Sequence, residues 1–175
     1  MEGVNLRRAG EFKYLGSVFM ENGLIDKEIN RGIQQGRAFY NKIKGLVWSE
    51  NVPLKCKRAI YKTYFVPIIT YAAETWTMKT KEENKIQAAD MRFIRSMIGK
   101  TRRDRIRNEN CRNIAQVEGV LQSISRSRLK WYRHMRRMEE DRIPQKYYNM
   151  TFSRLRWSDL LNKEIIKRGE DPSTI

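Results

Sequence analysis

The sequence contains few of the residues from which metal centres and disulfide frameworks are built. Among its 175 residues there are two cysteines and one histidine, whereas a closed zinc site takes four cysteine or histidine ligands. We therefore expect no metal and no other cofactor. Because two isolated cysteines form no disulfide framework, a reducing intracellular location, the nucleus or the cytoplasm, is expected.

Long apolar segments are also absent. No run of about 18 apolar residues occurs, which argues against a membrane-spanning helix. Residues 1–20 lack the basic-then-apolar pattern of a signal peptide. Hydrophobic residues nevertheless make up 40% of the chain, which is enough for a folded core. We expect a folded protein without a membrane partner.

Motifs for nucleotide binding and phosphoryl transfer are missing as well. The sequence has no G-x-x-x-x-G-K loop and no G-x-G-x-x-G loop. Its aspartates lie apart from one another, so no carboxylate cluster for two metal ions is evident. His134 stands among arginines, and neither Cys56 nor Cys111 has a neighbouring base in the sequence. We predict that the chain has no catalytic site of its own.

Positive charge is what the sequence has in excess. Lys and Arg number 36 and Asp and Glu number 20, which gives a net charge of +16. Fourteen of the cations but only three acidic residues lie between Arg92 and Arg137. Such a charge concentrates polyanions at the surface, and arginine suits bidentate contact with phosphate. Nucleic acid is therefore the favoured partner, ahead of an anionic membrane.

The apolar pattern predicts a mainly α fold with a short N-terminal β-hairpin. Residues Phe12 to Met20 are aromatic and β-branched and precede turn residues at positions 21–23, which predicts a strand entering a hairpin turn. Gly16 within this strand indicates a bulge or a close backbone approach. Apolar residues then recur at helical spacing, in a stripe formed by Ile29, Ile33, Gly36, Tyr40, Ile43 and Val47.

Further helices are expected along the rest of the chain. Pro53 suits the first turn of a second helix, which Pro67 should kink or end. A helix over residues 80–98 is marked by the capping-box spacing of Thr80 and Glu83 and by Gly99 as its stop. A short helix over residues 108–117 is expected to be capped by Asn108 and ended by Gly119, and a longer helix spans residues 121–139. A linker at 150–154 and a last helix that contains Trp157, Leu161 and Ile165 follow.

The predicted long helix carries cations along one face. At about 100° per residue, four cations fall within an arc of about 60°, opposite the apolar residues. No acidic residue between Leu121 and Met138 neutralises them, and Arg128, which falls among the apolar residues, should extend to solvent. We predict that this stripe and the preceding connector bind nucleic-acid phosphates: Arg126, Lys130, Arg133 and Arg137 in the stripe, and Lys100, Arg102, Arg103, Arg105 and Arg107 in the connector.

Six short segments occur in an order that is typical of one family. They read FKYLG at 12–16, EINRGI at 28–33, KRAIY at 57–61, YAAETW at 71–76, RDRIRN at 103–108 and LKWYRHMRRM at 129–138. Together they resemble the C-terminal part of reverse transcriptases from non-LTR (LINE-type) retrotransposons. The chain departs from the family at Ala72-Ala73, where Gly-Cys is more usual, and at Arg133, where Gly is usual.

The resemblance implies a domain organisation and a partner. Residues 1–24 would be a lead-in and a primer-grip hairpin, with Lys13, Tyr14 and Gly16 near the primer end. Residues 25–119 would form a thumb-like helical bundle, and residues 120–175 a basic helix with a C-terminal helical extension. The expected partners are RNA, DNA or an RNA–DNA duplex, and the palm and fingers of a parent polymerase.

The paired aspartates of the family's polymerase palm are absent from the sequence. The chain is therefore expected to bind nucleic acid without synthesising DNA. Two other interpretations stay open on the sequence alone. The chain could be a truncated remnant without a function, or a helical module that binds another protein through its apolar stripes.

Overall fold

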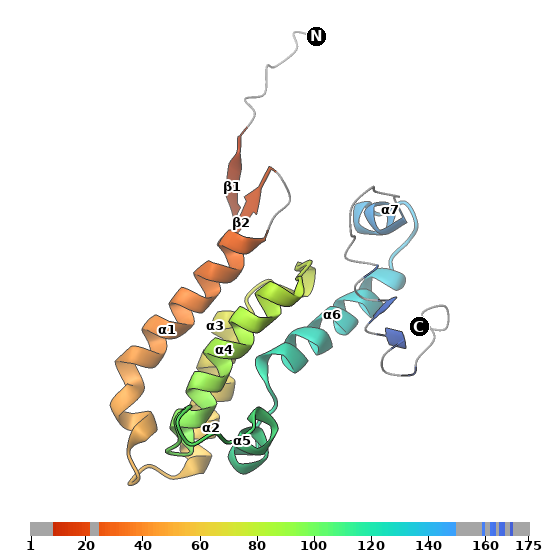
Figure 1. Ribbon diagram of the computed structural model, residues 1–175. Coiled ribbons are helices and arrows are strands. Elements are labelled where there is room, and N and C mark those ends of the chain that lie inside the picture. Colours follow the sequence, from red (N-terminus) through yellow and green to blue (C-terminus); the bar gives the residue numbers. More distant parts are fainter. Residues whose placement is uncertain are drawn as a thin grey trace.

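A short β-hairpin stands at one end of a helical bundle (Figure 1). The computed structural model describes residues 9–21 and 25–149, together with residues 159, 162, 163, 165, 166 and 169. Strands β1 (Glu11–Tyr14) and β2 (Ser17–Met20) are antiparallel, with Phe12 opposite Phe19. The helices that follow confirm the predicted fold class, which is mainly α with a short N-terminal hairpin.

The hairpin turns at Leu15 and Gly16, so the prediction of one longer strand ending at residues 21–23 was wrong. Leu15 has φ 46° and Gly16 has φ 87°. Two consecutive positive φ values are typical of the tight type I′ turn, whose twist matches that of the flanking strands. Gly16 therefore serves the turn and does not form a bulge. Asn22 and Gly23 lie outside the described residues.

Polar contacts fix the hairpin to helix α1 (Asp26–Trp48). The backbone N–H of Val18 donates to the buried carboxylate of Glu28 at 2.9 Å, and Arg31 pairs with the same carboxylate at 2.5 Å. At the turn, the hydroxyl of Tyr71 donates to the carbonyl of Leu15 at 2.5 Å. These contacts hold the turn and the first half of β2 against the helices, so the hairpin keeps a defined orientation on the bundle.

The predicted apolar stripe of α1 forms one side of the core. Ile29, Ile33, Tyr40 and Val47 are buried. A Cβ on Gly36 would lie 2.7 Å from the side chain of Ile69, so the glycine permits the close approach of a neighbouring helix. The stripe is thus confirmed, and the glycine within it has a packing role.

The second helical run continues past Pro67. Helix α2 (Leu54–Ile60), the π-helical segment η1 (Tyr61–Phe65) and α3 (Val66–Ile69) follow one another without a gap. The N–H of Val66 donates to the carbonyl of Tyr61, five residues back. This wider turn lies directly before Pro67. Because proline has no backbone N–H, it interrupts the hydrogen bonding of a helix, and the wider turn accommodates that interruption. The helix ends two residues after the proline.

Helix α4 (Thr80–Met97) follows the short 3-10 segment η2 (Ala73–Thr75). Its first turn is capped one residue earlier than predicted, because Glu82 rather than Glu83 accepts the N–H of Lys79, at 3.0 Å. Its end is as predicted. Gly99 has φ 65°, and the N–H of Lys100 donates to the carbonyl of Arg95 at 2.8 Å, a hydrogen-bond pattern common after helices.

Helix α5 (Asn108–Ala115) differs from the prediction at both ends. Asn108 is its first helical residue and not its cap, and its side-chain oxygen accepts a hydrogen bond from Arg95 at 2.7 Å. The helix stops before Gln116, which has φ 52°, and not at Gly119. Helix α6 (Val120–Arg136) follows, and then α7 (Ile143–Asn149), which the sequence pattern did not predict.

The core divides along α6. Residues Val120 and Ile124 join the main core cluster, whereas the second half of α6 forms a smaller cluster of Leu129, Tyr132, Met135 and Ile165. The predicted linker at 150–154 lies outside the described residues, as do Trp157 and Leu161 of the predicted last helix. Ile165 is described, helical and buried. The domain boundaries at residues 24 and 119 stay predictions.

Arg128 does not extend to solvent, so that prediction was wrong. Its side chain is buried among the apolar residues of α6, and its guanidinium donates to the carbonyl of Trp76 at 2.6 Å. A buried cation is tolerated where hydrogen-bond acceptors meet it. The acceptor belongs to Trp76, which directly follows η2 and lies 52 residues earlier, so the helix pattern alone could not reveal it.

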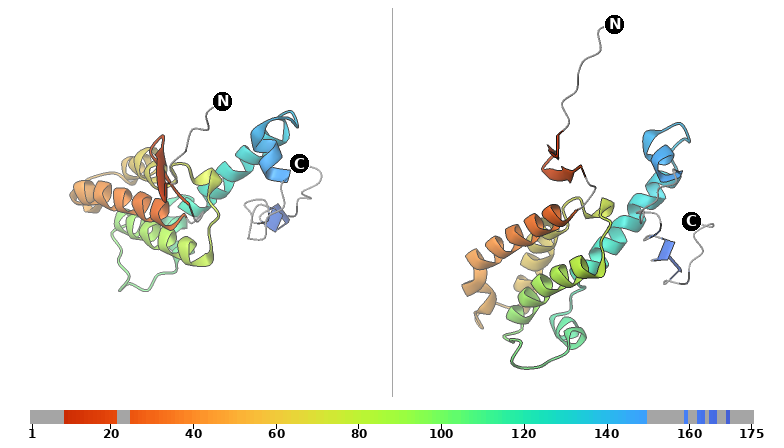
Figure 2. Two further views of the ribbon diagram at one scale, coloured as in Figure 1. Left: turned by 90° about the horizontal axis from the view of Figure 1, so that it is seen from above. Right: turned by 45° about the horizontal axis from the view of Figure 1, so that its top comes forward.

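Figures 1 and 2 show how the helices are arranged. Helices α1 and α4 lie side by side and run away from the hairpin, while α2 and α3 return toward it. Helix α6 leaves the bundle beside α5 and extends outward to α7. Within the described residues, no helix is both long and apolar enough to cross a membrane.

A buried carboxylate links three of these elements. Asp90 on α4 is 1% exposed and accepts hydrogen bonds from the hydroxyl of Tyr61, at 2.6 Å, and from the N–H of Val120, at 3.2 Å. The guanidinium of Arg112 lies 3.8 Å away. Asp90 therefore ties η1 and the start of α6 to the middle of α4.

Candidate nucleic-acid interface

A cationic cleft of about 610 Å³ opens between α1, α4 and the connector that follows α4. Helix α1 contributes Arg37 and Lys44 to its lining, and α4 contributes Arg92 and Arg95. The connector adds Lys100, Arg102 and Arg103. None of the described residues that line the cleft is acidic.

Helical spacing places these side chains on facing surfaces. Arg37, Tyr40, Lys44 and Trp48 are three or four residues apart, so they share one face of α1. Ala88, Arg92 and Arg95 share a face of α4 in the same way. The edge contact between the rings of Tyr40 and Phe93, with centroids 5.5 Å apart, joins the two helices beneath the cleft.

Aromatic and small side chains form the interior of the cleft. Tyr40 and Ala89 are buried, and Trp48 is partly buried. The indole N–H of Trp48 donates to the hydroxyl of Tyr40 at 3.0 Å, and the guanidinium of Arg92 lies 5.2 Å from the centre of the Tyr40 ring. The cleft therefore has an aromatic interior and a cationic rim.

Two of the lining cations are engaged with the protein itself. Arg95 donates to the carbonyl of Ile106 at 3.2 Å and to the side chain of Asn108, so it holds the connector in place. Lys100 lies 4.0 Å from Asp104. Hydrogen bonds from the N–H and the hydroxyl of Thr101 lower the pKa of Asp104, which therefore stays ionised.

The other five cations have no acidic partner in the part of the chain that the structure describes. They are Arg37, Lys44, Arg92, Arg102 and Arg103. All five are exposed at the rim of one cleft. Like charges at such spacing repel one another, and an anion placed between them would remove this repulsion.

The structure brings together only some of the residues predicted to bind nucleic acid. Lys100, Arg102 and Arg103 line the cleft, whereas Arg105 and Arg107 are exposed on the same connector outside it.

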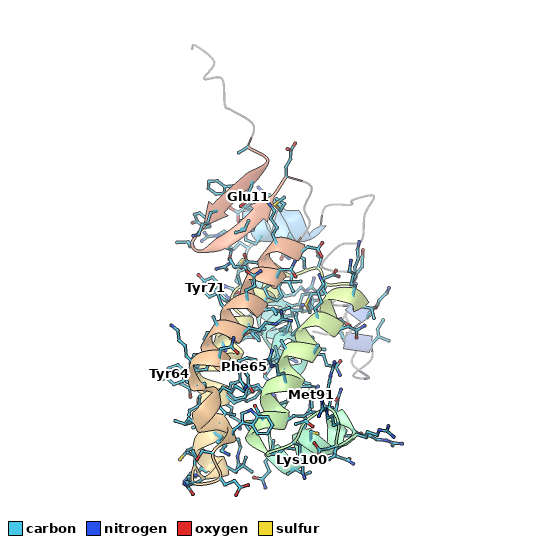
Figure 3. All side chains as sticks on the ribbon, turned by 60° about the vertical axis from the view of Figure 1, so that its left-hand side comes forward. Glu11, Tyr64, Phe65, Tyr71, Met91 and Lys100 are labelled. Atoms are coloured by element: carbon cyan, nitrogen blue, oxygen red, sulfur yellow. The ribbon has the colours of Figure 1, made fainter. Side chains whose placement is uncertain are left out.

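The hairpin residues Lys13, Tyr14 and Gly16 lie at the other end of the bundle. Figure 3 shows this separation, with Glu11 and Lys100 at opposite ends. Arg37, the first cleft residue on α1, comes eleven residues after the start of that helix at Asp26, which corresponds to about 16 Å along the helix. The hairpin and the cleft are thus separate surfaces.

The stripe of Arg126, Lys130, Arg133 and Arg137 is exposed, but, contrary to what the sequence had suggested, not all of its cations lack an acidic partner. Arg126 pairs with Glu118, which lies before the helix, so the expectation of an unneutralised stripe was wrong at this residue. Lys130 lines a separate hollow of about 350 Å³ together with Glu74. Arg133 and Arg137 are exposed, and Arg133 has interactions of its own.

Arg37, Lys44 and Arg92 were not among the residues predicted to bind nucleic acid. That prediction rested on the basic stripe and the basic connector, whereas these three residues stand on the faces of two amphipathic helices. A usable signal was present, because each cation is three or four residues from Tyr40 or Ala88 on its own helix. That signal marks a face of a helix but does not say which other face it meets.

The described residues contain no group of three or more His, Cys, Asp and Glu side chains placed to hold a metal ion. Cys111 is buried in the core, and Cys56 is exposed on α2. The ring of His134 lies 5.4 Å from that of Trp131 on α6. The cleft itself is lined by cations, aromatic rings and small side chains.

Comparison with known proteins gives one informative relationship. No family model matches the chain, and no solved structure matches it. A protein of Caenorhabditis elegans, described by its name as transposon-derived and uncharacterized, is 25% identical over 178 aligned residues. The alignment covers 94% of this chain, and the chain spans 63% of the length of that relative. Over most of its length, the chain is therefore a distant relative of a transposon-derived protein.

Proposed function

We propose that this chain binds nucleic acid through the phosphate backbone, without reading sequence, and that it derives from the thumb region of a retrotransposon RNA-directed DNA polymerase. The observation that carries the proposal is the cationic cleft, in which five rim cations have no acidic partner among the described residues. Phosphates are the anions that nucleic acids present at regular intervals, and arginine binds them bidentately.

The origin in a mobile element has separate support. The C. elegans relative is transposon-derived by name, and the six segments described above resemble a retrotransposon polymerase in their order. The polymerase palm's paired aspartates do not occur in this sequence. The chain by itself is accordingly proposed to hold nucleic acid and not to extend a primer.

A second candidate function is favoured by the hairpin. Phe12 is 59% exposed, Tyr14 is 57% exposed and Phe19 is 53% exposed. Phe12 and Phe19 pair across the strands, and the rings of Phe12 and Tyr14 stack with centroids 6.3 Å apart. Exposed aromatic side chains on one face are typical of surfaces that bind another protein. The palm of a parent polymerase is the partner proposed for this surface.

The main proposal is tested by the binding of a fluorescent RNA–DNA duplex to the purified chain over a series of salt concentrations. We expect the affinity to fall steeply with salt, because binding releases counterions from the duplex. A cleft variant lacks four rim cations, through the substitutions Arg37→Ala, Lys44→Ala, Arg102→Ala and Arg103→Ala. For this variant we expect weaker binding and a salt slope smaller by about one unit for each phosphate that the variant no longer neutralises.

A control variant removes the same amount of charge elsewhere. It carries Lys55→Ala, Lys81→Ala, Arg136→Ala and Arg142→Ala, at exposed residues that do not line the cleft. Equal weakening of binding in both variants would show that only net charge matters and would contradict the cleft as the site. No binding of the unaltered chain at low salt would favour the remnant interpretation.

A further inference from the structure

We infer that the cationic cleft receives an unpaired nucleotide of a single strand, with the base against the aromatic interior and the neighbouring phosphates at the rim. The inference rests on the proposed function and specifies the ligand of the same site. It follows from the size of the cleft, from the side chains inside it and from the placement of the rim cations.

The volume of the cleft suits one nucleotide better than a duplex. Pockets for small ligands measure roughly 300 to 1,000 Å³, and this cleft measures about 610 Å³. In a duplex the bases are stacked and paired inside, so a duplex could lie only across the rim and would leave the interior unfilled. A single strand can turn one base into the interior.

The interior offers flat surfaces on which a base can stack. Bases in single strands stack on aromatic rings and on the planes of arginine guanidinium groups. Trp48 is partly buried and lines the cleft, and the guanidinium of Arg92 lies above the ring of Tyr40. The small side chains of Ala88 and Ala89 leave space beside them.

Apart from its arginines, which can bind the edge of guanine, the walls carry few groups that distinguish one base from another. The lining contains no Asp, Glu, Asn or Gln side chain among the described residues, and Thr101 supplies its one hydroxyl besides that of Tyr40. Stacking is tolerant of sequence because every base has a π face. We therefore expect the cleft to accept single strands of different sequence.

The rim cations surround the interior on both sides. Arg37 and Lys44 are seven residues apart on α1, which corresponds to about 10 Å along the helix. Arg102 and Arg103 approach from the connector, beyond the end of α4. Phosphates that precede and follow an inserted nucleotide would thus meet cations from different elements.

The test uses two fluorescent probes of equal length, a single-stranded oligonucleotide and the matching duplex. The variant Ala88→Leu narrows the cleft, which Ala88 lines as an exposed residue, without changing any charge, and leucine is nearly as good a helix former as alanine. We expect this variant to bind the single strand about ten-fold or more weakly, as expected when one base can no longer stack. Its affinity for the duplex should stay unchanged.

Ala59→Leu is the matched control, because Ala59 is exposed on α2 and does not line the cleft. It should bind both probes as the unaltered chain does. An Ala88→Leu variant that binds both probes normally, or that binds both equally weakly, would overturn the inference. If neither probe binds the unaltered chain, the proposed function fails. If duplex binding depends on the rim cations and Ala88→Leu leaves single-strand binding unchanged, only this inference fails.

A free nucleotide offers the same base and phosphate groups as a nucleotide within a strand. A competition experiment is therefore needed to tell which of the two ligands the cleft binds. Adenosine monophosphate or triphosphate is added at the concentration of nucleotide units present in the single-stranded probe. We expect little displacement, because the strand is held by several phosphates at once. Full displacement under these conditions would assign the cleft to free nucleotides and overturn the single-strand assignment.

Discussion

At the scale of single residues, Asp90 shows how burial alters an ionisable group. Removal from water raises the pKa of Asp90 to about 6, and the hydrogen bonds from Tyr61 and Val120 offset only part of this rise. The folded protein thus holds the proton more tightly than the unfolded chain does. As the pH rises from about 4 to about 6, the unfolded chain ionises first, and the contribution of Asp90 to stability falls.

The variant Asp90→Asn cannot ionise and reveals this effect. We expect the free energy of unfolding of the unaltered protein to fall, relative to that of the variant, between about pH 4 and about pH 6 and to stay level above pH 7. Chemical denaturation at a series of pH values measures the difference in the free energy of unfolding between the unaltered protein and Asp90→Asn. Asp104→Asn serves as the comparison of opposite sign. Because the pKa of Asp104 is lowered, its contribution to stability is present above about pH 4 and is lost as the pH falls further, so this variant should show no such change between about pH 4 and about pH 6. A difference for Asp90→Asn that rises or stays constant over this range would contradict the prediction.

At the scale of elements, the hairpin shows how far local sequence determines structure. The aromatic and β-branched residues predicted extended chain correctly, but they did not predict where the chain turns. The residue before Gly16 is leucine, whereas asparagine or aspartate is usual at this position of a type I′ turn. The turn instead depends on tertiary contacts, among them the hydrogen bond from Tyr71 to the carbonyl of Leu15.

Leu15→Asn should stabilise the hairpin. Leu15 has φ 46° and is 75% exposed, so the substitution removes backbone strain and little buried surface. A left-handed conformation costs an ordinary residue about 1–2 kcal/mol, and asparagine tolerates it better. We expect slower hydrogen exchange at the amides of β1 and β2 in the variant. Leu15→Ala keeps the strain and should give no such gain, and faster exchange in Leu15→Asn would refute the explanation.

Helix ends and caps show the same limit. Gly99 ends α4 as expected, because a glycine with positive φ serves this role within one turn of chain. Asn108 was expected to cap α5, but its side chain instead accepts a hydrogen bond from Arg95, thirteen residues earlier. A residue suited to capping is predictable from local sequence, but the partner it takes is decided by what packs beside it.

At the scale of the whole molecule, the net charge of +16 acts on both stability and binding. Mutual repulsion among cations destabilises a compact state. Salt shortens the distance over which charges act, from about 30 Å at about 0.01 M to about 8 Å at about 0.15 M. Added salt should therefore stabilise the fold while it weakens the binding of nucleic acid.

We expect the melting temperature of the free protein to rise over this range of salt. The rise should be smaller in the cleft variant that lacks Arg37, Lys44, Arg102 and Arg103, because part of the repulsion has been removed. Differential scanning calorimetry measures the rise in melting temperature for the unaltered protein, for the cleft variant and for the four-residue control variant. A melting temperature that falls with added salt, or that rises equally in the unaltered protein and the cleft variant, would contradict this account of the cleft.

The sequence by itself determined the helical fold class, the apolar stripes and the excess of cations, because periodicity and charge are properties of neighbouring residues. Only the tertiary structure decided which cations act together. Arg37, Lys44 and Arg92 meet the connector because α1 packs beside α4, whereas Glu118 neutralises Arg126 and the carbonyl of Trp76 allows Arg128 to be buried. These contacts join residues that lie far apart in the chain or on different elements, and they follow from how the helices pack, which no local pattern records.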